Sequence, residues 1–276
     1  MRALLKYLPS CLLASGLVVA TISANAQIVT LTDNNATAVV NTGSQAGMDF
    51  WSVDGNGLAG QNQLAQQWFW YRVGNTVPQS IDTISSPHNT LVGLNNLTTT
   101  YSSLNFNISI SYGLVGNGVG SSDISEGIQI QNTSSSTLNI SFFQYSHFTL
   151  LGETNGNTLA MGNSLAYQNN GQTAIQEGII APNASAYEAN TYGGPNDTRS
   201  KLNGTSGLVL NNNANASGDV TWAFEWDLSI APGSVFDINK DKVLSISTVP
   251  EPSVLGLIPT GFAVFALRRR FIAKKG

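Results

Sequence analysis

Apolar and polar residues alternate with a period of two along most of the chain, whereas the 3.6-residue period of a helix is almost absent. Period-two alternation places every second side chain on the same face of a β-strand. The clearest example runs from Leu104 to Tyr112 without a break. The pattern predicts strands that share a common core. The side chains expected in that core are Phe106, Ile108, Ile110, Ile128, Ile130, Leu138, Ile140, Phe142, Trp222, Phe224 and Trp226.

Turn-forming residues separate the alternating runs, as at 54–57, 116–118 and 132–136. Gly and Asn tolerate positive φ, and Asn, Asp and Ser bond to the nearby backbone, so these clusters favour tight turns. Many short strands joined by turns predict an all-β fold, an antiparallel β-sandwich or jelly roll. A short helix can form at 62–67, and the weakest pattern lies at 167–217, where we expect long loops.

The body between Gln27 and Thr248 is acidic, with fifteen acidic and five basic residues and hence a net charge of −10. Binding of nucleic acid requires clustered Lys and Arg, so no nucleic-acid partner is expected. Only 10% of all residues are charged, against about 25% in typical proteins. Polarity comes mostly from Asn, Ser, Thr, Gln and Gly, which suits a protein that lives among polysaccharides.

The N-terminus has the features of a secretion signal. Two basic residues precede an apolar stretch at 12–22, and Ala24 and Ala26 form an A-x-A cleavage site. This order is typical of a Sec signal peptide, so we expect residues 1–26 to be removed after export through the Sec translocon. Cys11 is the only cysteine and leaves with the signal. The mature chain is therefore expected to have no disulfide and no thiol chemistry.

The C-terminal segment, residues 249–276, has three parts in order: a Pro-Glu-Pro motif, an apolar run and an arginine cluster. This arrangement resembles the PEP-CTERM sorting signal of exported bacterial proteins. The resemblance implies an exosortase-type processing enzyme as a transient partner. The sorting residues that it implies are Pro250, Glu251, Pro252, Arg268, Arg269 and Arg270.

The apolar run at 253–267 is short for a permanent membrane span. A helix of this length reaches about 22 Å, whereas the hydrocarbon core is about 30 Å thick. We expect a brief stay as a transmembrane helix in the inner membrane, with the arginines on the cytoplasmic side. The cell surface, outer envelope or extracellular matrix is the expected destination. The alternative is a permanent single-pass anchor.

The chain is thus divided into a signal peptide (1–26), a β-sandwich domain (27–248) and a sorting signal (249–276). Two features of the domain could bind or cleave a glycan. Glu225 and Asp227 share a face of a predicted strand, roughly 7 Å apart, and paired carboxylates hydrolyse glycosides. The favoured alternative is a solvated face opposite an apolar stripe.

Trp68 and Trp70 are weak candidates for stacking on sugar rings. They share one face of a strand, and Phe69 and Tyr71 share the other. Aromatic side chains gain most from burial, so at least one pair belongs to the core. Arg72 follows them and is expected to pair with Asp49 or Asp54, or to lie on an aromatic ring.

Metal and cofactor motifs are incomplete. The segment 237–241 starts like a calcium loop, but Lys242 occupies the position that requires Gly. We interpret this segment as a charged edge strand. His88 and His147 define no metal site, and there is neither a G-x-S-x-G motif nor a phosphate-binding loop. No catalytic residue, metal or cofactor is therefore predicted.

The body resembles a recurring type of PEP-CTERM protein in the segments 67–74, 122–126, 142–148 and 219–227. These proteins have no assigned biochemistry. The sequence therefore predicts a non-enzymatic, exported surface or matrix protein associated with exopolysaccharide. The alternatives are a carbohydrate-binding module and, third, an exported glycan hydrolase.

Overall fold

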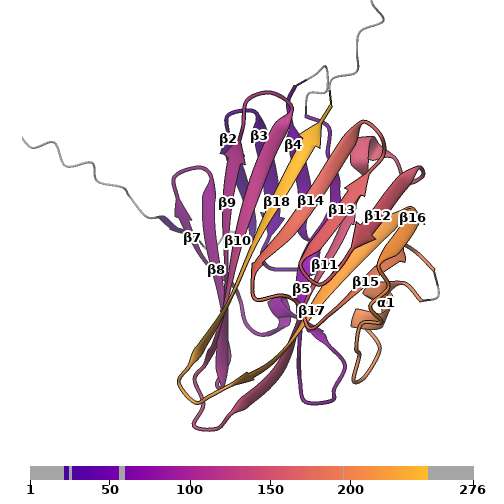
Figure 1. Cartoon of the computed structure of the whole chain (residues 1–276). Coiled ribbons are helices and arrows are strands. Elements are labelled where there is room, and N and C mark those ends of the chain that lie inside the picture. Colours follow the sequence, from indigo (N-terminus) through magenta and orange to yellow (C-terminus); the bar gives the residue numbers. More distant parts are fainter. Residues whose placement is uncertain (1–21, 25–26, 56–59, 195, 248–276) are drawn as a thin grey trace, which may run out of the picture.

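Two β-sheets packed face to face make up the part of the protein that the computed structural model describes, residues 22–24, 27–55, 60–194 and 196–247 (Figure 1). Neighbouring strands pair antiparallel, except for a short parallel contact between Gly47–Met48 and Gln67. The predicted sandwich is therefore confirmed. Most of the predicted signal peptide and all of the predicted sorting signal lie outside the described residues.

The ten-stranded sheet contains the long hairpin β9–β10 and the last described strand, β18. Its spatial order is β1 (Ile22–Ala24), β7 (His88–Val92), β8 (Asn96–Ser102), β9 (Phe106–Gly116), β10 (Ser121–Asn132), β18 (Val235–Ile246), β14 (Thr173–Ala181), β13 (Leu165–Asn169), β12 (Asn157–Met161) and β16 (Asn215–Gly218).

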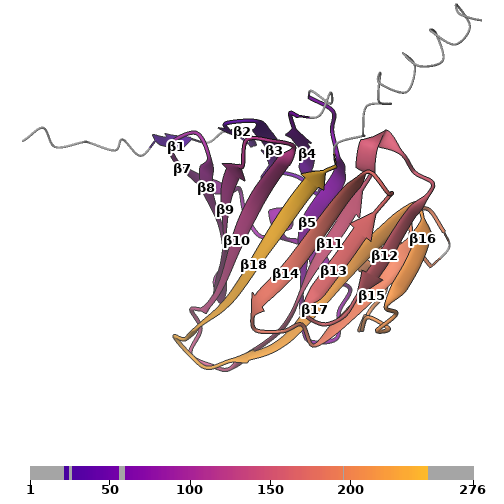
Figure 2. The ribbon, with the colours of Figure 1, turned by 45° about the horizontal axis from the view of Figure 1, so that its top comes forward.

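The eight-stranded sheet lies across from it, with β11 and β17 opposite β18 and β14 (Figure 2). Its order is β15 (Ala186–Thr191), β17 (Val220–Ile230), β11 (Leu138–Phe148), β5 (Leu64–Val73), β4 (Gly47–Val53), β3 (Ala36–Asn41) and β2 (Ile28–Asp33), with β6 (Gln79–Ser80) beside β5. The helices are short: η1 (Ile81–Thr83), η2 (Leu150–Gly152) and α1 (Thr198–Leu202). None of these described helices has the length and apolarity to cross a membrane.

The space between the sheets holds the core that the alternation predicts. All eleven predicted core side chains are at most 7% exposed. The register explains this, because Ile128 faces Ile110 on one neighbouring strand and Ile238 on the other. On neighbouring strands of the eight-stranded sheet, the rings of Trp222 and Phe148 stack with centroids 5.3 Å apart. Hydrophobic burial on this scale is the main favourable contribution to folding.

Two local predictions are wrong, and a third, the long loops at 167–217, holds only for residues 203–214 between α1 and β16. The helix at 62–67 is replaced from Leu64 onward by β5, which is buried on both faces and so shows no alternation. The stretch 167–217 contains β14, β15, β16, part of β13 and α1, whose short strands carry many small or polar residues. The charged edge strand at 237–241 is instead central, because β18 pairs with β10 and β14.

Strand β1 adds a short edge to the ten-stranded sheet. Ile22 pairs with Leu91 and Ala24 with Asn89 of β7. Cleavage after Ala26, which the sequence predicts, would remove this strand. Strand β7 would then form the edge of the mature sheet.

Candidate functional site

Four charged side chains meet in the core between the two sheets. Lys240 Nζ lies 2.6 Å from Glu126 Oε2 and 3.0 Å from Glu177 Oε1. Lys242 also pairs with Glu126, and Gln144 from the opposite sheet binds Lys240. The indole of Trp222 donates to Glu177 Oε2 at 2.8 Å. These residues form the buried charge cluster, which links strands of both sheets.

The buried charge cluster is electrically balanced, with two lysines and two glutamates. Burial alone raises the pKa of Glu177, but Lys240 and Lys242 outweigh it and lower the pKa to about 2. Burial lowers the pKa of Lys240, but Glu126 and Glu177 outweigh it and raise the value overall. None of the four side chains exceeds 2% exposure. The cluster therefore holds the sheets in register and offers no surface to a ligand.

A second charged group lies on the outer face of the eight-stranded sheet, where β5, β11 and β17 are neighbours. Arg72 Nη2 donates to Ser141 Oγ at 2.8 Å, and Ser141 Oγ donates to Asp227 Oδ1 at 2.6 Å. The same guanidinium nitrogen lies 3.9 Å from Glu225 Oε1 and 4.0 Å from Asp227 Oδ1. We call Arg72, Ser141, Glu225 and Asp227 the arginine cluster.

Strand register creates the arginine cluster. Ser141 pairs with Arg72 on β5 and with Asp227 on β17, so the three side chains stand in one row across the sheet. The predicted pairing of Arg72 with Asp49 or Asp54 is wrong, because the strand order places Arg72 beside Glu225 and Asp227. The expected contact with an aromatic ring is confirmed. Besides its acidic partners, its guanidinium carbon lies 5.9 Å from the centre of the Phe143 ring.

The two carboxylates of the arginine cluster have different surroundings. The Asp227 side chain is 52% exposed, whereas that of Glu225 is fully buried. The backbone N–H of Leu210 donates to Glu225 Oε2 at 2.8 Å. The solvated face predicted for this pair is therefore wrong for Glu225, because the chain around Leu210 covers it.

Burial and, to a smaller extent, the charge of Asp227 raise the pKa of Glu225 to about 7. The Leu210 N–H and the Arg72 guanidinium oppose this rise without cancelling it. A carboxyl group with such a pKa can hold or release a proton near neutral pH.

Two open depressions adjoin the arginine cluster at the end of β5. One has a volume of about 320 Å³ and the other about 380 Å³. The first is lined by Gly74, Asn139, Ile140, Ser141, Asp227, Leu228 and Ser229. The second is lined by Tyr71, Arg72, Val73, Thr76, Gln79, Asn105, Phe106 and Leu138. Together they offer hydroxyl, amide and charged groups beside a half-buried tyrosine.

The predicted sugar-stacking residues, Trp68 and Trp70, lie outside the arginine cluster and its depressions and are buried. Trp68 and Trp70 have no exposed surface, so a sugar cannot stack on them as the protein stands. The indole of Trp68 donates to Ser80 Oγ at 2.8 Å and that of Trp70 to Asn203 Oδ1 at 3.1 Å. Segments remote in sequence supply these partners, so the sequence gives no local sign of the burial.

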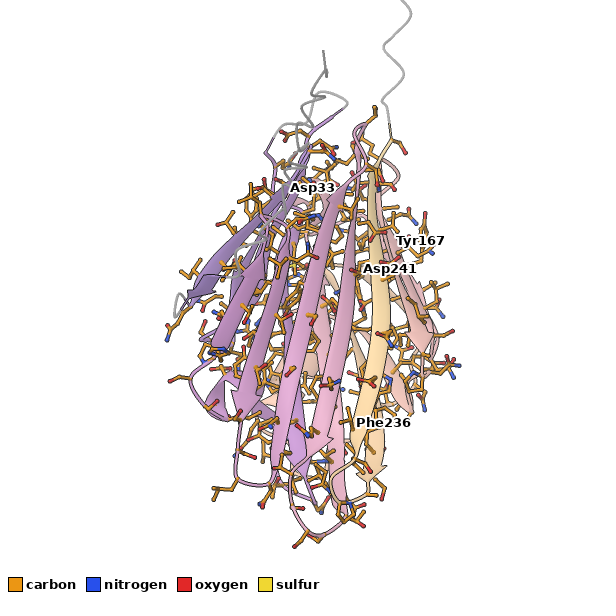
Figure 3. All side chains as sticks on the ribbon, turned by 90° about the vertical axis from the view of Figure 1, so that its left-hand side faces the viewer. Asp33, Tyr167, Phe236 and Asp241 are labelled. Carbon is orange, nitrogen blue, oxygen red and sulfur yellow. The ribbon has the colours of Figure 1, made fainter. Side chains whose placement is uncertain are left out.

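The incomplete calcium loop is part of strand β18, and its acidic residues Asp237 and Asp241 lie on the outer face of the ten-stranded sheet, which Figure 3 shows with Asp241 labelled. Asp237 is exposed and accepts a hydrogen bond from Gln129 at 3.1 Å. Within the described residues, no group of three or more His, Cys, Asp or Glu side chains could hold a metal ion. Ala24 of the predicted cleavage site lies in β1, and Ala26 lies outside the described residues.

No protein-family model matches the sequence, and a search of curated proteins finds no match. Solved structures with a similar fold do exist. A bacterial glucoamylase complexed with acarbose is 11% identical with a TM-score of 0.56, over 90% of this chain and 36% of that chain. An Escherichia coli K12 protein described as an aldose 1-epimerase is 11% identical with a TM-score of 0.56, over 82% of this chain and 100% of that chain.

A GalM/aldose epimerase homologue from C. elegans is 6% identical with a TM-score of 0.51, over 82% of this chain and 100% of that chain. At such identities the likeness shows the fold alone. The fold is nevertheless one that occurs in carbohydrate-active enzymes. The prediction of a non-enzymatic protein is contradicted by these neighbours, which are enzymes. That prediction rested on the lack of a recognisable catalytic motif in the sequence.

Proposed function

We propose that the protein is exported and binds a glycan at the arginine cluster and its two depressions. The observation that carries this proposal is the hydrogen-bonded row formed by Asp227, Ser141 and Arg72. Asp227 is exposed, and the largely buried Ser141 and Arg72 each line one of the two depressions. A carboxylate, a hydroxyl and a guanidinium can each bond to sugar hydroxyls, and few fixed polar groups suffice to orient a ligand. The carbohydrate-related proteins with a similar fold support the ligand class.

The two terminal segments support a location outside the cell, where the protein would encounter such a glycan. The predicted Sec signal at 1–26 and the PEP-CTERM-like segment at 249–276 direct the chain to the cell surface or extracellular matrix. The cell's own exopolysaccharide is the glycan that we propose. Exosortase-type processing, with passage through the inner membrane, belongs to the same proposal.

Ser141→Ala and Asp227→Asn are expected to weaken glycan binding by about tenfold or more. Ser141→Ala removes a hydroxyl, and Asp227→Asn removes the charge that strengthens hydrogen bonds to the carboxylate; a hydrogen bond to a charged group is worth about 1.5–3 kcal/mol. The measurement is calorimetry of the full-length protein with host exopolysaccharide fragments. Asp237→Asn is the matched control, since it neutralises an exposed carboxylate on the other sheet. Unchanged affinity in both variants, with unaltered thermal stability, would show that the site lies elsewhere.

Glycan hydrolysis is the second candidate function, and the pKa of Glu225 favours it. A carboxyl group protonated up to about pH 7 can donate a proton to a glycosidic oxygen. Asp227 on the same face supplies a second carboxylate. Because Glu225 is covered, a substrate reaches it only when the segment Leu208–Leu210 moves.

Release of reducing ends from exopolysaccharide is expected to fall as the pH rises through about 7, because Glu225 then loses its proton. Glu225→Gln should reduce the rate at least about a hundredfold, the usual contribution of a general acid. The measurement is a reducing-sugar assay between pH 4 and 9, with Glu153→Gln as an exposed control. Equal activity in Glu225→Gln and wild type would exclude this role.

A further inference from the structure

Arg199 differs from every other basic side chain of the described body. Arg72, Lys201, Lys240 and Lys242 each lie within 4 Å of a carboxylate. Arg199 forms no such ion pair with any described residue. In a body with fifteen acidic residues, an unpaired guanidinium is the natural place for an external anion.

Arg199 lines an open depression of about 520 Å³ beside α1 and β15 (Figure 1). The other lining residues are Tyr192, Gly193, Asp197, Ser200 and Asn203. The Asp197 carboxylate forms no ion pair with the Arg199 guanidinium and instead caps α1 by accepting from the Arg199 backbone N–H at 3.4 Å. Lys201 pairs with the buried Glu188 and so fastens the same helix to β15.

Tyr192 provides an aromatic ring next to this arginine. Its ring stacks on His147, with centroids 4.5 Å apart and planes at 20°. His147 is held in turn by Asp219, Nε2 to Oδ1 at 2.7 Å, and the Tyr192 backbone N–H donates to the Asp219 carbonyl at 2.8 Å. Tyr192 is still 44% exposed, so a ring fixed from behind presents open surface to the solvent.

We propose that this depression is a second glycan subsite that selects a sugar bearing a carboxylate, such as a uronic acid. The apolar face of the pyranose packs on Tyr192, and the sugar carboxylate forms a forked hydrogen bond with Arg199. The assignment of a glycan as the ligand rests on the proposed function. The assignment of Arg199 and Tyr192 to an anion-binding depression does not depend on it. The chain from Asn203 to Leu210 runs from this subsite to the arginine cluster, so one polysaccharide strand can contact both.

The test compares an oligogalacturonate with its carboxyl-reduced, neutral counterpart, using calorimetry on the full-length protein. Wild type is expected to bind the acidic oligosaccharide about tenfold tighter or more, the effect of one charge-assisted contact. Arg199→Gln should abolish that preference, and Arg199→Lys should retain part of it. Tyr192→Ala should weaken both ligands. Tyr167→Ala is the matched control, because Tyr167 is 40% exposed on the other sheet.

The two sites give separable outcomes. Ser141→Ala and Asp227→Asn should leave the preference for the acidic oligosaccharide intact, even if they weaken the binding of both oligosaccharides. Equal affinity of wild type for both oligosaccharides, or a preference that survives Arg199→Gln, would overturn the subsite. Tighter binding of an acidic peptide than of the oligogalacturonate, with the same dependence on Arg199, would overturn the assignment to a glycan.

Discussion

Replacing Lys240 by Met is expected to lower the free energy of unfolding by about 3–5 kcal/mol, the usual cost of breaking a buried ion pair. Lys240 contacts Glu126, Glu177 and Gln144 in the core, and Met cannot satisfy any of them. The two carboxylates would then share Lys242 as their only cation. Urea denaturation at pH 7 measures the loss.

A control on the same strand separates this effect from a general effect of charge. Asp237 lies on the outer, exposed side of β18, and Asp237→Asn should change stability by less than about 0.5 kcal/mol. The double variant Lys240→Met with Glu177→Gln should recover part of the loss, since it removes one orphaned charge. A loss below about 1 kcal/mol for Lys240→Met alone would mean that the buried charge cluster is not closed to water.

Acid is expected to destabilise the protein through Glu177. Its pKa is about 2 in the folded protein, against an ordinary value of 4.5. The depressed value means that the unfolded chain binds the proton first, so stability is complete above about pH 4.5 and is lost as the pH falls toward 2. At about 1.4 kcal/mol per pKa unit, the loss is on the order of 3 kcal/mol.

Denaturation curves at several pH values between 2 and 6 measure this loss. Glu177→Gln should be less stable than wild type at pH 6 and should show a shallower fall toward pH 2, because it lacks the titrating group. Glu153→Gln, at an exposed position, should keep the wild-type slope. If Glu177→Gln also kept that slope, the ion pairs of Glu177 with the two lysines would not be responsible.

The period-two pattern predicts the core strands well, because one face of each strand meets the other sheet. The same pattern contains the buried charge cluster. Lys240 and Lys242 fall between Ile238 and Leu244 on the apolar face of β18, and Glu126 and Glu177 occupy equivalent positions between isoleucines. The expected cost of burying a charge argued for an edge strand. Ion pairs with residues on neighbouring strands offset the cost of burying these charges. The sequence does not show which strands are neighbours, so it could not predict these pairs.

The candidate site was less predictable. The pair Glu225 and Asp227 follows from spacing alone, but the burial of Glu225 depends on Leu210, fifteen residues away. Trp70 is likewise covered through Asn203, from a distant segment. Tyr192 and Arg199 gave no signal in the sequence, because a lone tyrosine and a lone arginine belong to no motif. They become a candidate site only in the structure, where His147 and Asp219 hold Tyr192 in place beside an open depression.

The central place of β18 has a consequence for export. A chain that crosses the membrane with its N-terminus first delivers β18 after every other described strand. Until then, β10 and β14 have no common neighbour, and Glu126 and Glu177 have no lysines. The ten-stranded sheet therefore cannot close on a partly translocated chain. If the protein is exported as proposed above, folding of the body is therefore tied to the completion of transport, because the last strand to arrive completes the sheet.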